Sequence, residues 1–309
     1  MSNVLVTRDC DQEFSGRVMP EAPVKYVIIS PVRDEAEFIA LTAQSILRQT
    51  IRPSEWIIVD DGSTDETAKI IDQYAAEFPW IHAVHRSNRG FRQSGGGVVE
   101  AFNAGYSAIT CPDWEFVVKL DGDLIFDEKY FERCFERFRT ETRLGIAGGT
   151  IYYLVDGEER VEECPRFHVR GATKIYRREC WKEIGGLWQA PGWDTIDELK
   201  AQMLEWKTES FEDIKIQHQR QTGTAENLWN DLVKNGLARY IAGYHPLFLV
   251  ATCVLRLASK PYVVRSAGIL WGYIQGYAKN VPRVDDPALI RFVRREQLKR
   301  LMGRQTVWN

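Results

Sequence analysis

The sequence predicts an α/β fold, in which a mainly parallel sheet carries helices on both faces and a helical C-terminal region follows. Three observations lead to this prediction. Four short apolar runs alternate with segments of helical periodicity before residue 121. Two of these runs end in pairs of aspartates, and from about Asn227 the pattern turns helical and apolar. Strands that alternate with helices favour parallel pairing, because each helix returns the chain to the start of the next strand.

Each predicted strand in the first half is an unbroken apolar run with many β-branched residues. The first is Tyr26–Ser30, which Pro31 ends, and the second is Glu55–Val59. The third and fourth are Ile81–His85 and Trp114–Leu120. Runs of this kind, without polar alternation, are typical of strands that are buried on both faces.

Apolar residues at helical spacing separate these strands. We expect Ser63 or Thr64 to cap the second of the predicted helices. The helices run from Glu35 to Gln49, from the cap to Tyr74, and from the glycines at 95–97 to about Ala108.

The second half of the chain is less regular. It contains three more predicted strands and two short helices, and we find no internal repeat. The strands are Gly145–Leu154, Gly171–Tyr176 and Thr208–His218, and the helices are Arg178–Ile184 and Thr195–Leu204. We therefore divide the chain into a flexible lead-in over 1–23, a domain over 24–225 and a helical region over 226–309.

Bulk composition excludes some classes of function. The net charge is −3 and the pI is about 6.0, so the chain lacks the excess of positive charge that is typical of nucleic-acid-binding proteins. The six cysteines form no Cys-x-x-Cys pair, and we expect reduced thiols. Residues 1–23 lack the basic and apolar stretches of a signal peptide. We therefore expect a cytoplasmic protein.

The sharpest chemical signal is Asp121-Gly122-Asp123 at the end of the fourth strand. Two carboxylates around a glycine can share a divalent cation, and hard oxygen ligands favour Mn²⁺ or Mg²⁺. A second acidic pair, Asp60-Asp61, ends the second strand, where burying a charge is costly unless it binds something. Ligands of open α/β sheets bind beyond the carboxyl ends of the strands. Both pairs should therefore lie at one edge of the sheet.

Three ordered motifs carry a family resemblance. VIISPVRDE, EWIIVDDGSTDET and VVKLDGD, within residues 25–220, resemble the family-two glycosyltransferases with the A-type, Rossmann-like fold. The resemblance implies inverting transfer of a sugar from a nucleotide-activated donor, with uridine diphosphate (UDP) the commonest nucleotide. The domain over 24–225 would then be the catalytic, nucleotide-sugar-binding domain.

The resemblance also implies roles for residues at the strand ends. Asp60 would hold the base with Asp61 close by, while Asp121 and Asp123 would serve the sugar and the metal. His218, in His218-Gln219-Arg220, could contact metal or diphosphate. The other donor-binding candidates are Pro31, Arg33 and Glu35 beside base and ribose, and Arg92 beside the diphosphate.

Inverting transfer needs one general base, which deprotonates the acceptor hydroxyl as it attacks. In the family this base is an aspartate before a helix, in a Glu-Asp setting. The matching segment here is Gly192-Trp193-Asp194-Thr195-Ile196-Asp197-Glu198. Asp197 fits best and Asp194 is the alternative. Either acid could instead serve the start of a helix.

The C-terminal region is open to two interpretations. Its apolar segments, 240–257 and 267–274, alternate with basic residues, and a basic helix covers 291–304. Such helices suit attachment to an anionic membrane surface. They also suit a helical pair packed on the catalytic domain. The first interpretation would imply a polyprenyl-linked glycan as acceptor, at the inner face of a bacterial membrane.

Two alternative functions stay open. A non-catalytic scaffold that binds nucleotide sugars would explain the imperfect Glu-Asp motif. A sugar nucleotidyltransferase would want a glycine-rich loop after the first strand, whereas residues 31–35 contain no glycine. The sequence thus favours transfer of one sugar to a glycan or lipid-linked glycan, as in polysaccharide or glycolipid synthesis.

Overall fold

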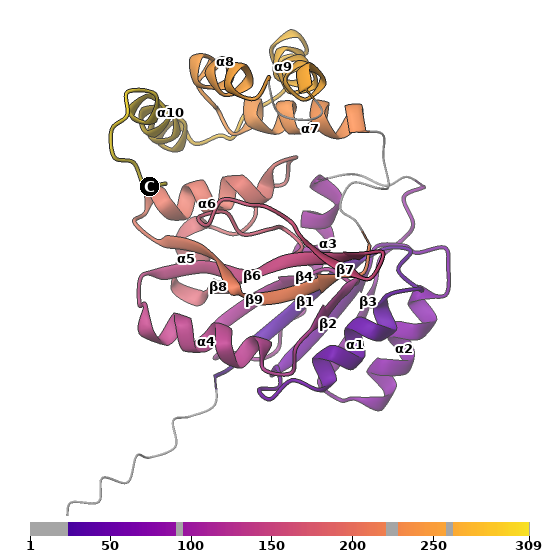
Figure 1. Ribbon diagram of the computed structural model, residues 1–309. Coiled ribbons are helices and arrows are strands. Elements are labelled where there is room, and N and C mark those ends of the chain that lie inside the picture. The colour runs from indigo at the N-terminus through magenta and orange to yellow at the C-terminus, as the bar shows by residue number, and fades with distance from the viewer. Residues whose placement is uncertain (1–23, 91–94, 221–227, 258–261, 309) are drawn as a thin grey trace, which may run out of the picture.

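A computed structural model describes residues 24–90, 95–220, 228–257 and 262–308. One mixed sheet forms the centre, helices cover both of its faces, and a layer of C-terminal helices lies beyond one face (Figure 1). The five cysteines in the described part are free thiols.

The first four predicted strands form the parallel half of the sheet. They are β1 (Tyr26–Val32), β2 (Glu55–Asp60), β3 (Ile81–His85) and β4 (Phe116–Leu120). Their spatial order is β3-β2-β1-β4, and all three pairings are parallel. The carboxyl ends of β1, β2 and β4 therefore share one edge, as expected.

The second half of the sheet is mixed. β8 (Thr173–Arg177) is antiparallel to β4, and β6 (Leu144–Val155) is antiparallel to β8. β9 (Lys207–His218) runs parallel to β6. The sequence analysis missed two strands: β5 (Leu124–Phe126), which pairs with the end of β9, and β7 (Glu158–Val161), which forms a hairpin with β6.

Alternate side chains of the central strands face two separate cores. Tyr26 and Ile28 face the core beneath α1 (Ile39–Leu47), α2 (Thr67–Glu77) and α4 (Tyr130–Thr140). Val27 and Ile29 face the core beneath α3 (Gly96–Ser107), α5 (Arg178–Ile184) and α6 (Trp193–Met203). Burial on both faces explains why these strands are uninterrupted apolar runs.

Two local predictions were wrong. The first helix begins at Ile39 rather than Glu35, and the second begins at Thr67 without a side-chain cap. The reason is that the two loops hydrogen-bond to each other. The Ser63 hydroxyl accepts from the Asp34 backbone N–H at 2.9 Å, and the Thr67 hydroxyl accepts from that of Glu35 at 2.7 Å.

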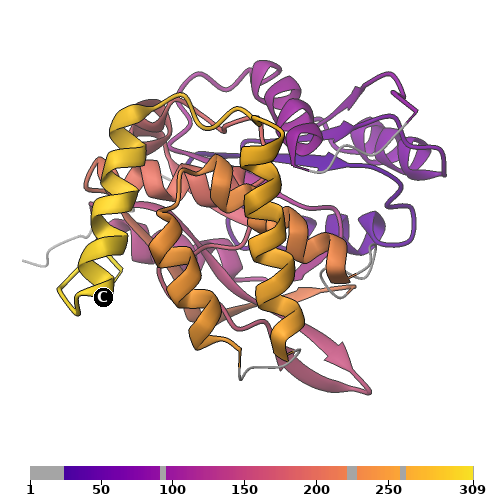
Figure 2. The same cartoon turned by 90° about the horizontal axis from the view of Figure 1, so that it is seen from above.

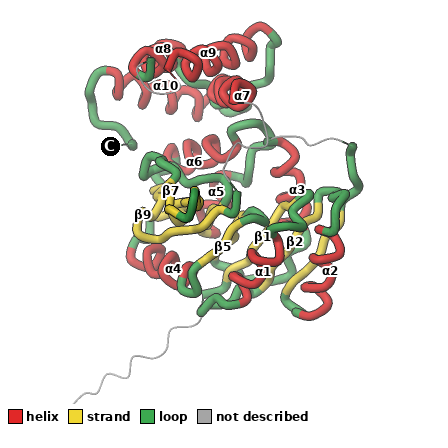
Figure 3. Tube along the Cα trace, turned by 45° about the vertical axis from the view of Figure 1, so that its right-hand side comes forward, coloured by secondary structure: helices red, strands yellow, loops and turns green. Residues whose placement is uncertain are grey.

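Four helices make the C-terminal layer: α7 (Leu228–Ile241), α8 (Pro246–Leu255), α9 (Tyr262–Ala278) and α10 (Pro287–Leu301). A third core joins this layer to α6 and includes Leu199, Tyr240 and Val293. In Figure 3 the layer lies on the α6 side of the sheet. Seen from above, α8 and α9 lie on the side of the layer that faces away from the sheet (Figures 1 and 2). In the described part of the chain, no helix is long and apolar enough to cross a membrane.

Candidate active site

The predicted acids gather where β1, β2 and β4 end. Val32, at the end of β1, is the register partner of Asp60 in β2. The loop after β4 packs on the same residue, because a Cβ on Gly122 would lie 2.7 Å from Val32 Cγ1 and 3.5 Å from Glu35 Cγ. A side chain at position 122 would push this loop away from the loop after β1. Glycine therefore lets Asp121 and Asp123 approach the other acids.

Asp123 is held by residues at the end of β9, the strand that pairs with β5 at the edge of the sheet. It is buried, and its Oδ2 lies 3.0 Å from His218 Nε2 and 2.7 Å from Arg220 Nε. β5 produces this contact, because Leu124 pairs with His218 in register. Burial alone would raise the pKa of Asp123, but the hydrogen bond and charge of His218, together with Arg220, lower it. Asp123 is thus kept ionised.

Arg220 also links Asp123 to Glu35. The guanidinium pairs with Glu35 Oε1, while Glu35 Oε2 is buried without a hydrogen-bond partner in the described structure. Burial raises the pKa of Glu35 to about 7, although Arg220 opposes this shift. An unsatisfied buried acceptor is costly, so Glu35 is a candidate to receive a ligand's hydrogen bond.

Asp121 is more accessible than Asp123, with a side chain that is 33% exposed. One oxygen pairs with the buried ammonium of Lys119, which also donates to the Gly171 carbonyl. Burial raises the pKa of Asp121, with Lys119 opposing it. Sequence reasoning missed Lys119, yet a lone cation inside an apolar strand is a usable signal.

The oxygen atoms of these acids fit a hard divalent cation that takes its remaining ligands from a substrate. The second oxygens, Asp121 Oδ2 and Asp123 Oδ1, accept no hydrogen bond from the part of the chain that the structure describes. Oxygen donors of this kind suit Mn²⁺ or Mg²⁺. Within the described residues, no group of three His, Cys, Asp or Glu side chains is arranged to hold a metal alone. A diphosphate and water would have to complete the coordination.

The acids after β2 are tied into their own loop. Asp60 Oδ1 accepts the Ser63 backbone N–H at 2.8 Å, and Oδ2 lies 3.1 Å from His85 Nδ1. Asp61 pairs with both Arg86 and Arg89. These partners explain how two acids are tolerated at a buried strand end.

The remaining donor-binding candidates lie near this loop. Pro31 is buried inside β1. Arg33 donates to the Asp61 carbonyl at 3.3 Å and to Asn88 Oδ1 at 3.0 Å, so it spans the loops after β2 and β3. Arg92 lies outside the described residues.

The two candidate bases differ sharply in environment. Asp194 lies in the first turn of α6 and is partly exposed, and its Oδ2 would be 3.1 Å from a Cβ on Gly171. It thus stands across Gly171 from Lys119 and Asp121. The Asp197 side chain is 0% exposed.

Asp197 belongs to a buried charge network. Its two oxygens lie 2.9 and 3.0 Å from Lys174 Nζ, and Oδ2 also accepts from the Tyr176 hydroxyl at 2.6 Å. Lys174 further binds Glu198 Oε1 at 2.8 Å and the carbonyl of Asp194. Burial raises the pKa of Asp197 to about 6, although Lys174 opposes it. Of the two candidates, Asp194 is thus the accessible one, whereas the sequence analysis ranked Asp197 first.

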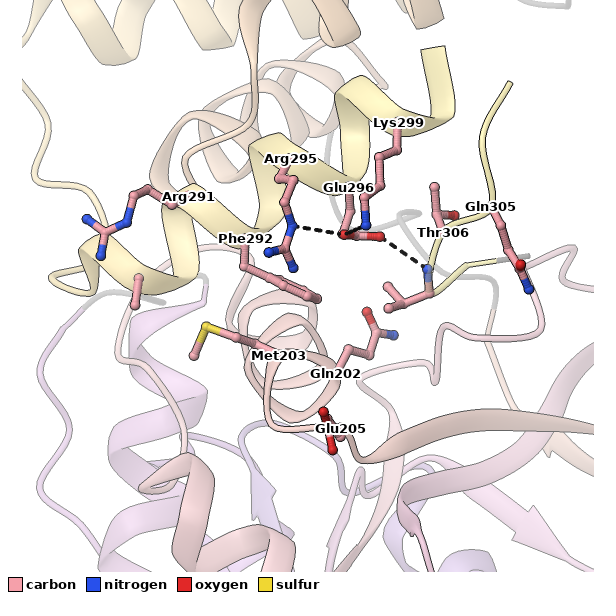
Figure 4. Close-up of a pocket in the computed structure, with 12 residues that line it drawn as sticks. Gln202, Met203, Glu205, Arg291, Phe292, Arg295, Glu296, Lys299, Gln305 and Thr306 are labelled. Carbon is pink, nitrogen blue, oxygen red and sulfur yellow. Dashed lines mark hydrogen bonds and ion pairs between the residues drawn. The ribbon is translucent and has the colours of Figure 1, made fainter. Parts of the chain in front are cut away.

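Two pockets in the structure lie away from the predicted site residues. One, of about 880 Å³, lies between the end of α6 and α10 (Figure 4). Two of its cations, Arg295 and Lys299, both pair with Glu296, at 3.2 and 2.7 Å. The other pocket, of about 990 Å³, lies beside the β6–β7 hairpin. Neither is lined by a predicted site residue.

Known proteins resemble this chain in sequence and in fold. The chain is 25% identical over 141 residues to the glycosyltransferase GlyG of Streptococcus pneumoniae, covering 43% of this chain and 44% of that protein. It is 33% identical over 140 residues to the uncharacterized glycosyltransferase alr2836 of Nostoc, covering 44% and 39%. The chain thus matches less than half the length of either relative.

A solved structure extends the likeness to the fold. The mannosyltransferase PcManGT from Pyrobaculum calidifontis, in complex with GDP-Man and Mn²⁺, has a TM-score of 0.58 at 15% identity, over 84% of this chain and 89% of that one. The sequence profile of glycosyl transferase family 2 matches residues 27–186, which is 160 of the 309 residues. The chain belongs to glycosyl transferase family 2.

Proposed function

We propose that the protein transfers one sugar, with inversion, from a nucleotide-diphosphate sugar to an acceptor hydroxyl. The observation that carries this proposal is the convergence of Asp121 and Asp123, each with one open oxygen, while Asp194 packs on Gly171, whose carbonyl binds Lys119, the partner of Asp121. Residues 24–225 would form the catalytic domain, and 226–309 a helical region that serves the acceptor.

Asp121 and Asp123 are the proposed ligands of Mn²⁺ or Mg²⁺, with His218 adjacent. The cation would offset negative charge on the departing diphosphate. The protein's own contribution is to keep its acids ionised and in place. His218 and Arg220 do so for Asp123, and Lys119 holds Asp121 in place and favours its ionised form against burial.

Asp194 is the proposed general base. An inverting mechanism requires one base within reach of the acceptor hydroxyl, and Asp194 combines partial exposure with a place across Gly171 from the metal acids. Asp197 would instead hold α6 in position through Lys174. Its buried, fully bonded carboxylate has no open path to a substrate.

The donor nucleotide is proposed to lie over the loops after β1 and β2. Glu35 and Asp60 would accept hydrogen bonds from ribose or base, and Arg33, Asp61 and Pro31 would shape their surroundings. Arg92 stays the candidate for the diphosphate. UDP is the first choice. Because the Pyrobaculum enzyme was solved with GDP-Man, guanosine donors belong in any test.

The acceptor is proposed to be a glycan or lipid-linked glycan of bacterial polysaccharide or glycolipid synthesis. The C-terminal layer supports membrane-surface contact, because α8 and α9 expose Val254, Val263 and Trp271. The protein would then sit peripherally on the inner face of the cell membrane.

Vesicle sedimentation tests this contact. Wild-type protein should sediment with vesicles that contain anionic phosphatidylglycerol, whereas Val254→Glu with Trp271→Glu should stay in the supernatant. Leu41→Glu is the control, because Leu41 is exposed on α1 in the sheet domain. Equal binding by all three proteins would reject the α8–α9 surface.

Nucleotide release tests the enzymatic function. Purified protein with UDP- or GDP-sugars and Mn²⁺ should release the nucleoside diphosphate, and EDTA should stop this release. Anomeric proton couplings in the product report inversion. A protein that binds UDP with Mn²⁺ yet turns over no donor with any acceptor preparation would instead be a scaffold.

A further inference from the structure

Three arginines meet where the C-terminal layer faces the sheet domain. Arg239 comes from α7, Arg256 ends α8 and Arg265 lies in the first turns of α9. Arg256 and Arg265 line the pocket of about 990 Å³ together with residues of β6, β7 and β9. Each of the three helices α7, α8 and α9 thus contributes one guanidinium group.

These arginines differ from the other cations of the same pocket. Arg170 pairs with Glu162, Arg166 with Glu209 at 2.6 Å, and Lys215 with Glu159 at 2.6 Å. By contrast, Arg239, Arg256 and Arg265 form no ion pair with any carboxylate in the described part of the chain.

Partial burial makes the lack of an anionic partner costly for Arg239 and Arg265, whereas Arg256 is exposed. Arg239 donates to the Asn235 carbonyl at 2.8 Å, which leaves its charge unpaired. Arg265 Nε is buried without a hydrogen-bond partner in the described structure. Burial lowers the pKa of Arg239, and the nearby charge of Arg256 lowers it further. Partly desolvated positive charges such as those of Arg239 and Arg265 destabilise a fold unless an anion joins them, and the exposed Arg256 is accessible to such an anion. Glu163 and Glu212 also line the pocket, but both are exposed and solvated.

The pocket lies beside the proposed base. Arg170, in its wall, directly precedes Gly171, against which Asp194 packs. Tyr244 lies within the influence of both groups: burial raises its pKa, the charge of Arg239 opposes this shift, and the charges of Glu198 and Asp194 add to it. An anion bound by these arginines would therefore be close to the acceptor hydroxyl.

The arginines also stand at the end of an apolar surface. Leu247 and Val254 on α8 are 65% and 58% exposed, and Leu255, next to Arg256, is 79% exposed. Val263 and Ile274 continue this surface along α9. Positive charge at one end of an exposed apolar face matches a molecule with an anionic head and a hydrocarbon chain.

We propose that this pocket binds the phosphate or diphosphate of a lipid acceptor, through Arg256 and Arg265, with Arg239 behind them. The hydrocarbon chain would leave along α8 and α9. The proposal rests on the proposed transferase function, for which it names the anionic group that positions the acceptor.

Calorimetric titration with farnesyl diphosphate tests the proposal. EDTA is present throughout, so that the probe cannot occupy a metal-dependent donor site. Wild type should bind this probe at least tenfold more tightly than farnesol or inorganic diphosphate. Arg256→Gln with Arg265→Gln should weaken binding tenfold or more, whereas Arg166→Gln, already neutralised by Glu209, should bind as wild type does.

Three outcomes would overturn the proposal. Unchanged affinity in the double variant would remove the arginines from the site. Farnesol binding as tightly as farnesyl diphosphate would make the pocket merely apolar, and equal binding of inorganic diphosphate would exclude the lipid chain. Binding of UDP with Mn²⁺ is measured in parallel. If the double variant keeps it while wild type binds no farnesyl diphosphate, the lipid site fails and the donor site stands.

Discussion

The sheet domain and the C-terminal helices bury their apolar residues to different degrees. Strand β1 is wholly buried, with Tyr26, Val27, Ile28 and Ile29 all 0% exposed. Nineteen large apolar side chains are exposed among the described residues, and fifteen of them lie from Leu228 onward. The sheet domain therefore closes around its own two cores, whereas the helical layer keeps an apolar face that a partner surface can cover.

The helical layer is nevertheless tightly packed within itself. A Cβ on Gly272 of α9 would lie 1.9 Å from the Val233 carbonyl oxygen of α7, and one on Gly236 would lie 2.0 Å from that of Ile269. Glycines thus allow the two helices to touch along their backbones. The exposed apolar face is consequently not a sign of loose folding. The sheet domain holds the proposed chemistry, and the helical layer is the part that we propose presents the acceptor.

The largest effect is expected at the proposed base. Asp194→Asn should reduce the transfer rate about 10²–10⁴-fold, the usual contribution of a general base, while leaving Mn²⁺-dependent donor binding unchanged. Initial rates and donor titrations measure the two quantities. Asp213→Asn, an exposed acid on β9, is the matched control. Full turnover in Asp194→Asn would remove this residue from the mechanism.

Asp197→Asn should act on stability. The amide would leave the buried ammonium of Lys174 with one carboxylate fewer, and breaking a buried ion pair costs about 3–5 kcal/mol. Urea unfolding gives the change in free energy. A variant as stable as wild type but inactive in transfer would restore Asp197 as the base.

The packing of the helical layer can be tested with Gly272→Ala. The added methyl group meets backbone, so overpacking should destabilise the layer by about 1–3 kcal/mol. Helix propensity alone predicts the opposite sign, about 1 kcal/mol of stabilisation. Thermal unfolding followed by circular dichroism therefore separates the two views, and a higher melting temperature would reject the close crossing.

A smaller effect of pH is expected from His168, whose Nδ1 lies 2.7 Å from Glu198 Oε2. Burial lowers the pKa of His168, but the charge and hydrogen bond of Glu198 outweigh burial and raise it above 6.5. A raised histidine pKa stabilises the fold below the unfolded value, and this stability is lost as pH rises through the folded pKa. Wild type should thus lose more of its stability than His168→Gln as pH rises above 6.5. Parallel melting curves against pH would contradict this.

Sequence patterns predicted the central strands because burial on both faces dictates unbroken apolar runs. They did not predict the elements whose structure depends on pairing with residues far along the chain. β5 has three residues and exists by pairing with the end of β9, and the first loop is ordered by Ser63 and Thr67 of the second. α4 is different, since Phe131, Phe135 and Phe138 already have helical spacing. That signal was present and overlooked.

Asp121 and Asp123 could be proposed as metal ligands from sequence because their motif is local. The partner of Asp121, Lys119, lies two residues away in the same motif, whereas Asp123 is held by Arg220 from the end of β9, far along the chain. The proposed preference for Asp194 over Asp197 could not be read from spacing, because it rests on their difference in exposure, and the Asp197 carboxylate is buried against Lys174 of β8.

Calorimetric titration of UDP and GDP tests the central claim most directly, in Mn²⁺ and in EDTA, with wild type and Asp123→Asn. We predict that wild type binds at least one of these nucleotides more tightly with Mn²⁺, and that Asp123→Asn loses this gain while keeping its metal-free affinity. A gain from Mn²⁺ that persists in Asp123→Asn would contradict the account.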